Sequence, residues 1–456
     1  MNPWKLLPIL ALAFACGDND TGAGGDTDAA ADGDTDADTD ADTDVTDGLE
    51  DVMRDCPADV GNICPWAGAG YNGFNGDVAD PLELWFSFPM DVEISPYGAP
   101  AIADYNNHRI RIVEDMTGAG TGQIRTIMGS TAPGDGDALF ADRTDAGALG
   151  TTVSLNHPTQ HEYAPDGTLW SASWHTHKLR TWDPTTELVH VVFGLLPGYA
   201  PDENADANGD EILGDNAGEP MSAVGVKLNQ PKALHLLDNG DVMILDMRNE
   251  RIRLWDVSAN TIETIVNSSG IRGNANETGP AHLAQVNFPN GTNPEPGGAM
   301  AFNADESLMY LADTQNNCIR VVDLDTDLIS TVAGVCDEVI GDEVGAATDA
   351  RFSYPADIAL DEAAGILFVA DTNNNSVKAI DLATGNVTRV AGTGAPTCVS
   401  PYGELVPAFC PEQHTAGDGG VAVEATLYRP FGVAVDADGN LVVADTYNHR
   451  LRVVYR

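Results

Sequence analysis

Positive charge is scarce in this sequence. Lysine and arginine together contribute 22 residues against 70 aspartates and glutamates, and the formal net charge at pH 7 is -48. A surface of this sign repels phosphate backbones, and no basic stripe offsets it. The composition therefore excludes nucleic acid as an expected partner.

Catalytic motifs and long apolar runs are missing as well. The sequence has no nucleophile elbow and no HExxH zinc motif, and its Gly-Asp-Gly turns precede expected strands rather than the helix that a phosphate loop needs. The apolar run LLPILALAFA is about ten residues long, too short to cross a bilayer as a helix. We assign no catalytic residues from the sequence.

The first residues have the pattern of a processing segment. Residues 1–15 combine one lysine with the apolar run and end in small residues directly before Cys16. The stretch AFAC followed by Gly17 resembles a bacterial lipoprotein signal, in which the cysteine becomes the lipid-bearing N-terminus. We expect a signal peptide over 1–15 and lipidation at Cys16. The alternative is an ordinary secretory signal in which Cys16 is incidental.

Residues 16–52 carry an acidic residue at nearly every second position and have no aromatic residue or lysine. Such a segment cannot bury enough apolar surface to offset the entropy of ordering, and its charges repel one another. We therefore expect a disordered acidic tether. Together with Cys16 it predicts a protein of the bacterial cell envelope, anchored to a membrane only through lipid, or else periplasmic or secreted.

Six copies of one motif follow the tether, at a spacing of about 68 residues. Each copy alternates apolar and polar residues, passes through a polar turn and alternates again, which is typical of a hairpin. A proline-led apolar run before most copies and a run ending in glycine after most copies complete four strands. We predict an all-β, six-bladed propeller of four-stranded antiparallel blades over 53–456. The copies begin at residues 103, 171, 245, 312, 370 and 444.

The final copy, GDGGVAVEATLYRPFGVAVDADGNLVVADTYNHRLRVV, resembles an NHL repeat, and the resemblance covers nearly all of residues 63–456. It implies a six-bladed propeller that acts as a non-enzymatic binding scaffold, as in the NHL domains of adhesion proteins such as teneurins. The alternative, by analogy with six-bladed lactonases and NHL-like amidating lyases, is a metal-dependent enzyme with its site in the central channel. Fold analogy alone does not separate these functions.

The last copy ends at Arg456 without the outer strand that follows the other copies. The segment ICPWAGAGYNGFNGD from Ile63 aligns with ISTVAGVCDEVIGDEV, the outer strand and exit of the fourth copy. We therefore predict that an N-terminal strand completes the sixth blade and closes the ring, which removes the exposed sheet edges.

The polar residues of the motif are expected to be structural. A carboxylate before a turn accepts backbone N–H groups, and the arginine on the next strand is placed to pair with it. His108 and His449 fall in the same turns and receive the same interpretation. The two sets are Asp104, Asp246, Asp313, Asp371 and Asp445, and Arg111, Arg253, Arg320 and Arg452.

Cysteine usage fits an exported protein. Apart from Cys16 there are six cysteines, which allow fifteen pairings, and they fall into local pairs. We expect disulfides between Cys56 and Cys64, between Cys318 and Cys336, and between Cys398 and Cys410.

One acidic insertion resembles a calcium loop. Oxygen ligands stand at alternate positions before Gly209, and Asp215 stands where the loop would close. However, Glu211 replaces the apolar residue that such a loop needs, and no helix pattern flanks it. Calcium is thus a possible cofactor, and an acidic surface insertion is the alternative. The candidate ligands are Asn204, Asp206, Asn208, Asp210 and Asp215.

A second candidate site lies in the expected channel. Asp91, Gln160 and Asp357 occupy the second position after the strand proline, where propellers line their central opening, as does Gly432. The second copy is rich in histidine, and these residues either mark a divergent blade with polar substitutions or include a channel metal ligand, for which His161 is the first candidate. They are His157, His161, His175, His177 and His190. These channel residues either bind a cation or a polar ligand or are simply solvated. The expected partner is an envelope or extracellular protein or glycan, and the expected state is a monomer.

Overall fold

The computed structural model describes residues 56–456 except 78–79, 96–99, 115–122, 131–132, 140, 195–219, 225, 291–294, 338 and 395–415. Cys16, the tether, the calcium candidates, Cys398 and Cys410 therefore lie outside the described residues. No helix in the described part of the chain is long and apolar enough to cross a membrane.

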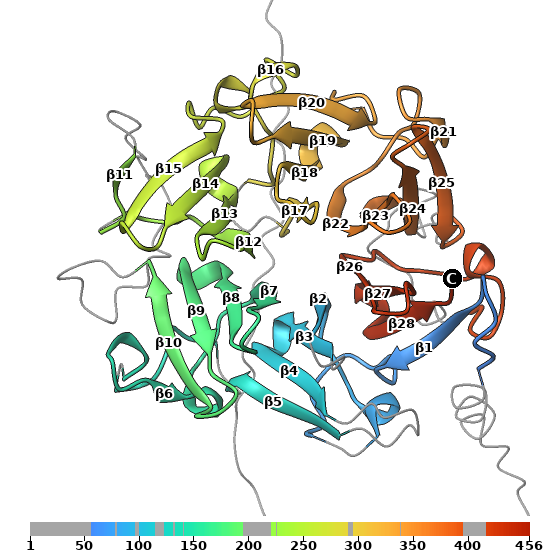
Figure 1. Ribbon diagram of the computed structural model, residues 1–456. Helices are drawn as coiled ribbons and strands as arrows, with labels where there is room; N and C mark the ends of the chain where they lie inside the picture. The colour runs from blue at the N-terminus through green and yellow to red at the C-terminus, as the bar shows by residue number, and fades with distance from the viewer. Residues whose placement is uncertain are drawn as a thin grey trace, which may run out of the picture. The chain divides into compact units, whose positions relative to one another are not determined.

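Six antiparallel sheets are arranged in a ring, with the first strand of each nearest the centre (Figure 1). This confirms the predicted all-β, six-bladed propeller. The first blade comprises β2 (Pro89–Ile94), β3 (Pro100–Asp104), β4 (Arg109–Glu114) and β5 (Gln123–Gly129); the second comprises β7 (Pro158–Tyr163), β8 (Leu169–Ser173), β9 (Lys178–Trp182) and β10 (Leu188–Phe193). The third comprises β12 (Pro231–Leu236), β13 (Val242–Asp246), β14 (Arg251–Asp256) and β15 (Thr261–Val266). The fourth comprises β17 (Ala299–Phe302), β18 (Leu308–Asp313), β19 (Cys318–Asp323) and β20 (Leu328–Ala333). The fifth comprises β22 (Pro355–Asp361), β23 (Ile366–Asp371), β24 (Ser376–Asp381) and β25 (Asn386–Ala391), and the sixth comprises β26 (Gly432–Val435), β27 (Leu441–Asp445), β28 (Arg450–Val454) and β1 (Ile63–Ala67).

Four blades differ from the prediction because a fifth strand of two residues pairs with their outer edge. The segment leading into each of these blades runs along the fourth strand before it turns inward, so its backbone hydrogen-bonds that edge and covers it. These strands are β6 (Ala148–Leu149), β11 (Met221–Ser222), β16 (Gly279–Pro280) and β21 (Gly345–Ala346).

Short 3-10 helices make up the remaining regular structure of the residues that the model describes. One lies between the second and third strands of every blade: η2 (Tyr105–Asn107), η5 (Trp174–Thr176), η6 (Met247–Asn249), η8 (Thr314–Asn316), η9 (Thr372–Asn374) and η12 (Thr446–Asn448). The others lie in the connections: η1 (Pro81–Glu83), η3 (Ala141–Arg143), η4 (Gly150–Thr152), η7 (Ala281–Leu283) and η11 (Ala422–Glu424).

The hydrophobic core is divided into layers between neighbouring blades. Side chains alternate between the two faces of a strand, and here each face of a sheet packs against one of the two neighbouring sheets in the ring. Leu245 and Ile252 of the third blade, for example, share one buried cluster with Met309 and Val322 of the fourth. Each blade is therefore stabilised by both of its neighbours.

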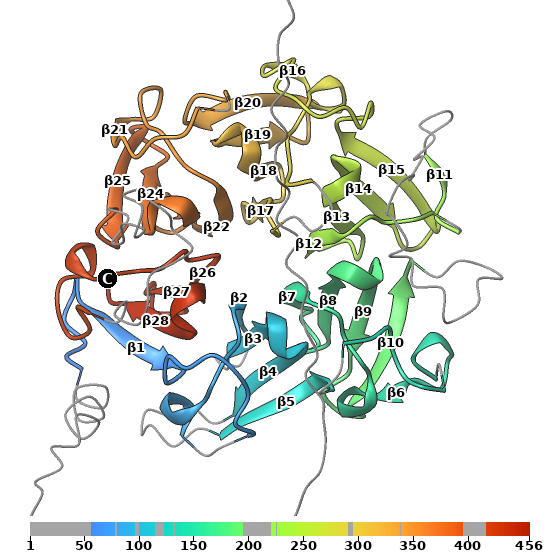
Figure 2. The same cartoon turned by 180° about the vertical axis from the view of Figure 1, so that it is seen from behind.

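The N-terminal strand closes the ring as predicted. β1 pairs antiparallel with β28, from Ile63 opposite Val454 to Ala67 opposite Leu451, and the two strands lie side by side in both views (Figures 1 and 2). Ile63 and Ala67 are buried. A disulfide between Cys56 and Cys64 ties the segment before β1 to the strand itself.

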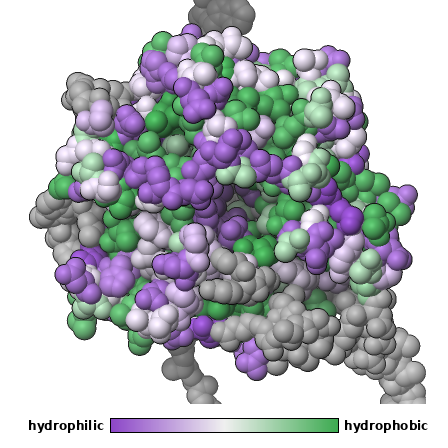
Figure 3. All heavy atoms as spheres, in the orientation of Figure 1, coloured by the Kyte–Doolittle hydropathy of each residue, from purple (hydrophilic) through white to green (hydrophobic). Residues whose placement is uncertain are grey.

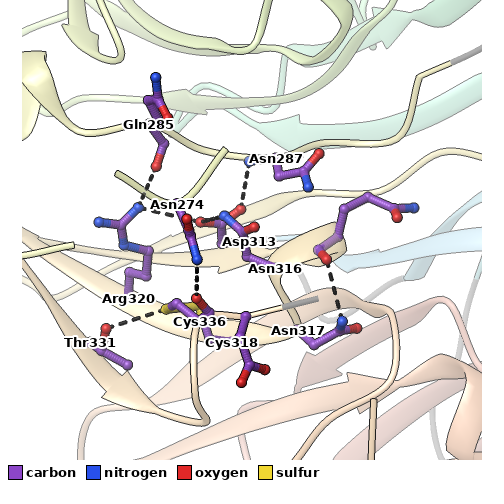
Figure 4. The surroundings of a disulfide bond; sticks show 12 residues. Asn274, Gln285, Asn287, Asp313, Asn316, Asn317, Cys318, Arg320, Thr331 and Cys336 are labelled. Carbon is purple, nitrogen blue, oxygen red and sulfur yellow. Dashed lines mark hydrogen bonds and ion pairs between the residues drawn. A yellow bond between two sulfur atoms is a disulfide. The ribbon is translucent and has the colours of Figure 1, made fainter. Parts of the chain in front are cut away.

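The second described disulfide, Cys318–Cys336, joins the start of β19 to the chain just beyond β20. Its surroundings show the structural unit of a blade (Figure 4). Asp313 Oδ1 accepts the main-chain N–H of Asn287 at 2.8 Å, while its Oδ2 accepts from Asn316 at 2.9 Å and lies 3.3 Å from Arg320 Nη1. The predicted structural roles of these aspartates and arginines are confirmed.

The same unit recurs in four other blades with one variation. Asp104, Asp246 and Asp445 pair with Arg111, Arg253 and Arg452, whereas Asp371 pairs with Lys378. The second blade lacks the aspartate, since Ser173 replaces it; there Arg180 binds Asp135, outside the hairpin, at 2.6 Å.

Candidate functional site

All six 3-10 turns between second and third strands lie on one face of the propeller, hereafter the turn face. The inner strands begin at this face, because each pairs antiparallel with the second strand; Pro89, for example, lies opposite Asp104. The hairpin loops between the first and second strands and between the third and fourth strands lie on the other face, hereafter the hairpin face. The channel mouth at the turn face is thus bordered by six turns and six strand starts.

Each of these turns ends in a residue with left-handed backbone, and its side chain accepts a hydrogen bond from the next blade. The donor is always the main-chain N–H of the residue directly before a proline, and in four blades that proline is the first residue of the inner strand. The acceptors and donors are His108 and His157, His177 and Gln230, Glu250 and Phe288, Asn317 and Tyr354, Asn375 and Arg429, and His449 and Phe88. These bonds link the six blades in one continuous ring.

The three turn histidines serve this role in their neutral form, because Nδ1 can accept a hydrogen bond only when it carries no proton. Burial, together with the adjacent cation Arg109, lowers the pKa of His108 to about 4. The pKa of His449 is lowered to about 4 by burial and Arg450. The interpretation of these histidines as structural residues agrees with their contacts.

The predicted channel residues Asp91, Gln160 and Asp357 occupy equivalent positions on their inner strands, opposite Ala103, Ala172 and Ala370. Their side-chain oxygens accept main-chain N–H groups of the following blade, from His161, Leu234 and Val433, at 3.0, 2.9 and 2.9 Å. These residues therefore act as bridges between inner strands, a role that neither sequence interpretation anticipated.

His161 is fully buried, which differs from the expectation that it lines the channel. Its side chain points toward the first blade, where Nδ1 lies 2.9 Å from Asp91 Oδ2. The equivalent residues of other blades, such as Val92 and Leu234, belong to the cores between blades. His161 thus replaces an apolar core residue.

At the next channel position along the inner strands, polar side chains are confined to three blades. This position lies two residues after Asp91 and its equivalents. It is Glu93, Glu162 and His235 in the first, second and third blades, and alanine in the other three blades. Burial, with the neighbouring carboxylates of Glu162 and Asp91, raises the pKa of Glu93 well above its ordinary value. Among the described residues, no three His, Cys, Asp or Glu side chains are grouped closely enough to hold a metal ion.

The histidines of the second blade do not form one cluster. His157 and His175 contact each other, with ring centroids 4.8 Å apart, and His108 of the first blade contacts His157 at 4.6 Å. His177 contacts the third blade instead, and His190 lies on the outer strand β10, with Nδ1 3.2 Å from the main-chain oxygen of Thr144.

Aromatic residues gather at the channel mouth on the turn face. Phe431 and Tyr354 are buried together with Met90, and Phe88, Tyr105 and Tyr447 pack against them. Figure 3 shows hydrophilic residues along part of the rim of the central hollow on the face it presents. Phe88, Tyr105 and Tyr447 are only partly buried, so a ligand at the mouth would meet aromatic rings beside polar groups, a combination that many binding sites use.

One carboxylate crosses this mouth. Glu295, from the segment before β17, is held by Arg429 of the sixth blade through two parallel contacts, Nη1 to Oε1 at 2.7 Å and Nη2 to Oε2 at 2.5 Å. Tyr447 donates its hydroxyl to Oε1 at 2.9 Å. Burial alone would raise the pKa of Glu295, but the hydrogen bonds and charge of Arg429 hold it below its ordinary value. The arrangement binds a carboxylate in its ionised form.

The sequence offered little signal for this site. Arg429 precedes a strand proline and Glu295 lies in a loop 134 residues away, so no local pattern connects them. The only available signal was composition: an arginine beside an aromatic pair, Tyr428 and Phe431, in a chain with few cations.

Comparisons with known proteins agree with this architecture. Residues 352–380 and 427–454 match the family model described as NHL repeat. The NHL repeat-containing protein 2 of Bos taurus is 25% identical over 366 residues, which cover 77% of this chain and 44% of that protein. Teneurin-1 of Mus musculus is 25% identical over 340 residues, covering 67% of this chain and 11% of that protein. The chain thus spans less than half the length of these relatives.

Among solved structures, an auxiliary nutrient binding protein from Bacteroides thetaiotaomicron superposes with a TM-score of 0.53 at 11% sequence identity. The superposition covers 86% of this chain and 75% of that chain. At this identity the likeness shows a shared fold.

Proposed function

Because this chain carries NHL repeats in a six-bladed β-propeller, we propose that it is an exported, membrane-tethered, non-enzymatic binding scaffold whose recognition surface is the channel mouth on the turn face. Lipidation at Cys16 would hold it at the envelope, and the tether would set its distance from the membrane. A flexible chain of this length has a typical reach of roughly 30–35 Å, and charge repulsion extends it.

The proposal rests on a contrast between the channel carboxylates, which have structural contacts, and the residues of the mouth. Asp91 and Asp357 accept backbone N–H groups of the next blade, so they are engaged in holding the ring together. The mouth, in contrast, has the partly exposed rings of Phe88, Tyr105 and Tyr447, and the Arg429 guanidinium lies beneath them, a combination that suits recognition. The solved relative named as a nutrient binding protein supports a binding role by analogy.

The test is capture of an envelope or extracellular partner by purified, immobilised protein. We expect a captured partner to be lost when Arg429 is changed to Met and to be retained by Asp325→Ala, a change in an exposed turn of the hairpin face. Thermal melting of both variants checks that the fold is intact, and Tyr447→Phe provides a milder change at the same mouth. Equal capture by wild type and the Arg429 and Tyr447 variants would contradict the proposal.

A channel enzyme is the second candidate, favoured by the acidic channel. Burial raises the pKa of Asp357, with Asp91 adding to the shift and Lys232 opposing it, and a carboxyl of raised pKa can act as a general acid. If Asp357→Asn abolished a hydrolytic or lyase activity while the Arg429 variant still captured its partner, the enzyme would replace the scaffold.

A further inference from the structure

The Arg429 pocket is organised to receive a carboxylate. Besides contacting Glu295, the guanidinium donates from Nη2 to Asn373 Oδ1 at 3.0 Å and from Nη1 to the Tyr447 hydroxyl at 3.0 Å. Its carbon atom lies 4.9 Å from the centroid of the Tyr447 ring and 5.4 Å from that of Phe431. These contacts fix the planar fork in advance, which lowers the entropy cost of binding a carboxylate in two-point fashion.

The pocket also contacts the backbone of its occupant. Tyr354, at the entry to the fifth blade, donates its hydroxyl to the main-chain oxygen of Glu295 at 2.8 Å. Pro296 follows Glu295 and restricts that residue to extended backbone. The site therefore holds an extended peptide at two points, a glutamate carboxylate and the carbonyl of the same residue.

The two sides of this contact differ in exposure. The Arg429 side chain is 10% exposed, whereas the side chain of Glu295 is 40% exposed. The guanidinium forms the base of the pocket and the glutamate approaches from solvent. Exchange of the glutamate for another would not require the hydrophobic cores between blades to open.

We propose that this pocket is a receptor for a glutamate in an extended segment of a partner protein, and that Glu295 is an internal occupant which the partner's segment displaces. The inference rests on the proposed function and names the ligand class of the same mouth. An internal occupant competes at an effective concentration of about millimolar, so the intact chain binds a partner segment more weakly than a chain without Glu295.

The probe is the chain's own sequence as a peptide, acetyl-TNPEPGG-amide, titrated calorimetrically at low salt into the full chain. We expect Glu295→Ala to bind it roughly tenfold or more tightly than wild type. We expect Glu295→Ala combined with Arg429→Met not to bind it, and the same peptide with Gln in place of Glu not to bind Glu295→Ala. Asp325→Ala is the matched control and should behave as wild type.

Three results would overturn the inference: no gain in peptide affinity for Glu295→Ala or for the milder Glu295→Gln, equal binding of the Glu and Gln peptides, or binding of glucuronate but not of the peptide. The last would indicate a carbohydrate ligand. If the peptide does not bind but partner capture still depends on Arg429, only this inference fails. If capture is also independent of Arg429, the proposed function fails with it.

Discussion

One residue in each blade, the left-handed residue that ends its 3-10 turn, joins that blade to the next. Histidine, glutamate and asparagine all occupy this position, because the requirement is only a side-chain acceptor on a backbone with positive φ. Where histidine occupies this position, its imidazole must be neutral to accept the bond. The contacts between these blades should therefore weaken in acid.

The first prediction concerns His108, His177 and His449. Their ordinary pKa is 6.5, and in the folded protein burial lowers each to about 4. As the pH falls, the unfolded chain binds protons first, so the stability they contribute is complete above about pH 6.5 and is lost as the pH falls to about 4. We expect the urea midpoint to fall over this window.

The control is the triple variant H108N/H177N/H449N, since Asn317 and Asn375 already perform the same role in the fourth and fifth blades. Burial raises the pKa of Asp104 and Asp313 to about 6, which favours the folded state as the pH falls, but this contribution is common to both proteins. The variant should therefore lose less stability than wild type between pH 7 and 4.5. Parallel curves would show that the histidines are not responsible.

The second prediction concerns Gly129, which ends β5 with a φ of +112°. A Cβ there would lie 2.2 Å from the main-chain oxygen of His108, so the strand passes too close to the turn for any side chain. We expect Gly129→Ala to lower the free energy of unfolding by about 2 kcal/mol or more, measured by urea denaturation.

Gly240 provides the comparison, since its φ is +88° but a Cβ would meet nothing within 4 Å. Gly240→Ala should lose only about 1 kcal/mol, from the backbone conformation alone. Equal losses at the two glycines would mean that steric contact with the turn is unimportant.

At the scale of elements, β1 decides whether the sixth blade is complete. Deleting residues 56–70 removes buried Ile63 and Ala67 and leaves β28 without its outer partner. We expect the free energy of unfolding to fall by about 3 kcal/mol or more beyond the loss in a C56S/C64S variant, which keeps the strand. Thermal or urea unfolding of the two proteins measures the difference. A deletion protein that unfolds like the cysteine variant would refute the closing role.

The elements were predictable because blade formation is encoded locally. Alternation fixes which face of a strand is buried, and the repeated turn fixes the hairpin register. The closing strand was found because Ile63 and its neighbours resemble the outer strand of the fourth copy. Both described disulfides followed from the closeness of their cysteines in sequence.

Contacts between blades were not predictable in the same way. The side chain of Asp91 has the sequence pattern of a channel residue, and only the offset between neighbouring sheets shows that its carboxylate meets the N–H of His161. Arg429 and Glu295 lie 134 residues apart, and no repeat pattern in the sequence relates their positions. The fold could therefore be predicted from the sequence of each blade, whereas the candidate site depends on how the blades pack together.

At the scale of the whole molecule, the proposed lipid attachment at Cys16 can be tested separately from the fold of the propeller. We expect Cys16→Ser to abolish partition into the detergent phase of a Triton X-114 extraction, because the acyl chains require the thiol. The melting temperature of the propeller should not change. A variant that still enters the detergent phase as wild type does would exclude lipid at this cysteine.

The six acceptor-donor bonds of the turn face all run in the same direction around the ring, each from the N–H of one blade to the turn of the blade before it. Every blade thus offers one acceptor side chain to the blade after it and one main-chain N–H donor to the blade before it, whichever residue supplies the acceptor. Units of this kind are interchangeable in principle: the order of blades could be permuted, or the chain opened at another junction, while all six joints remain made. Diversity in the loops and at the mouth can then accumulate blade by blade without disturbing the ring that carries it.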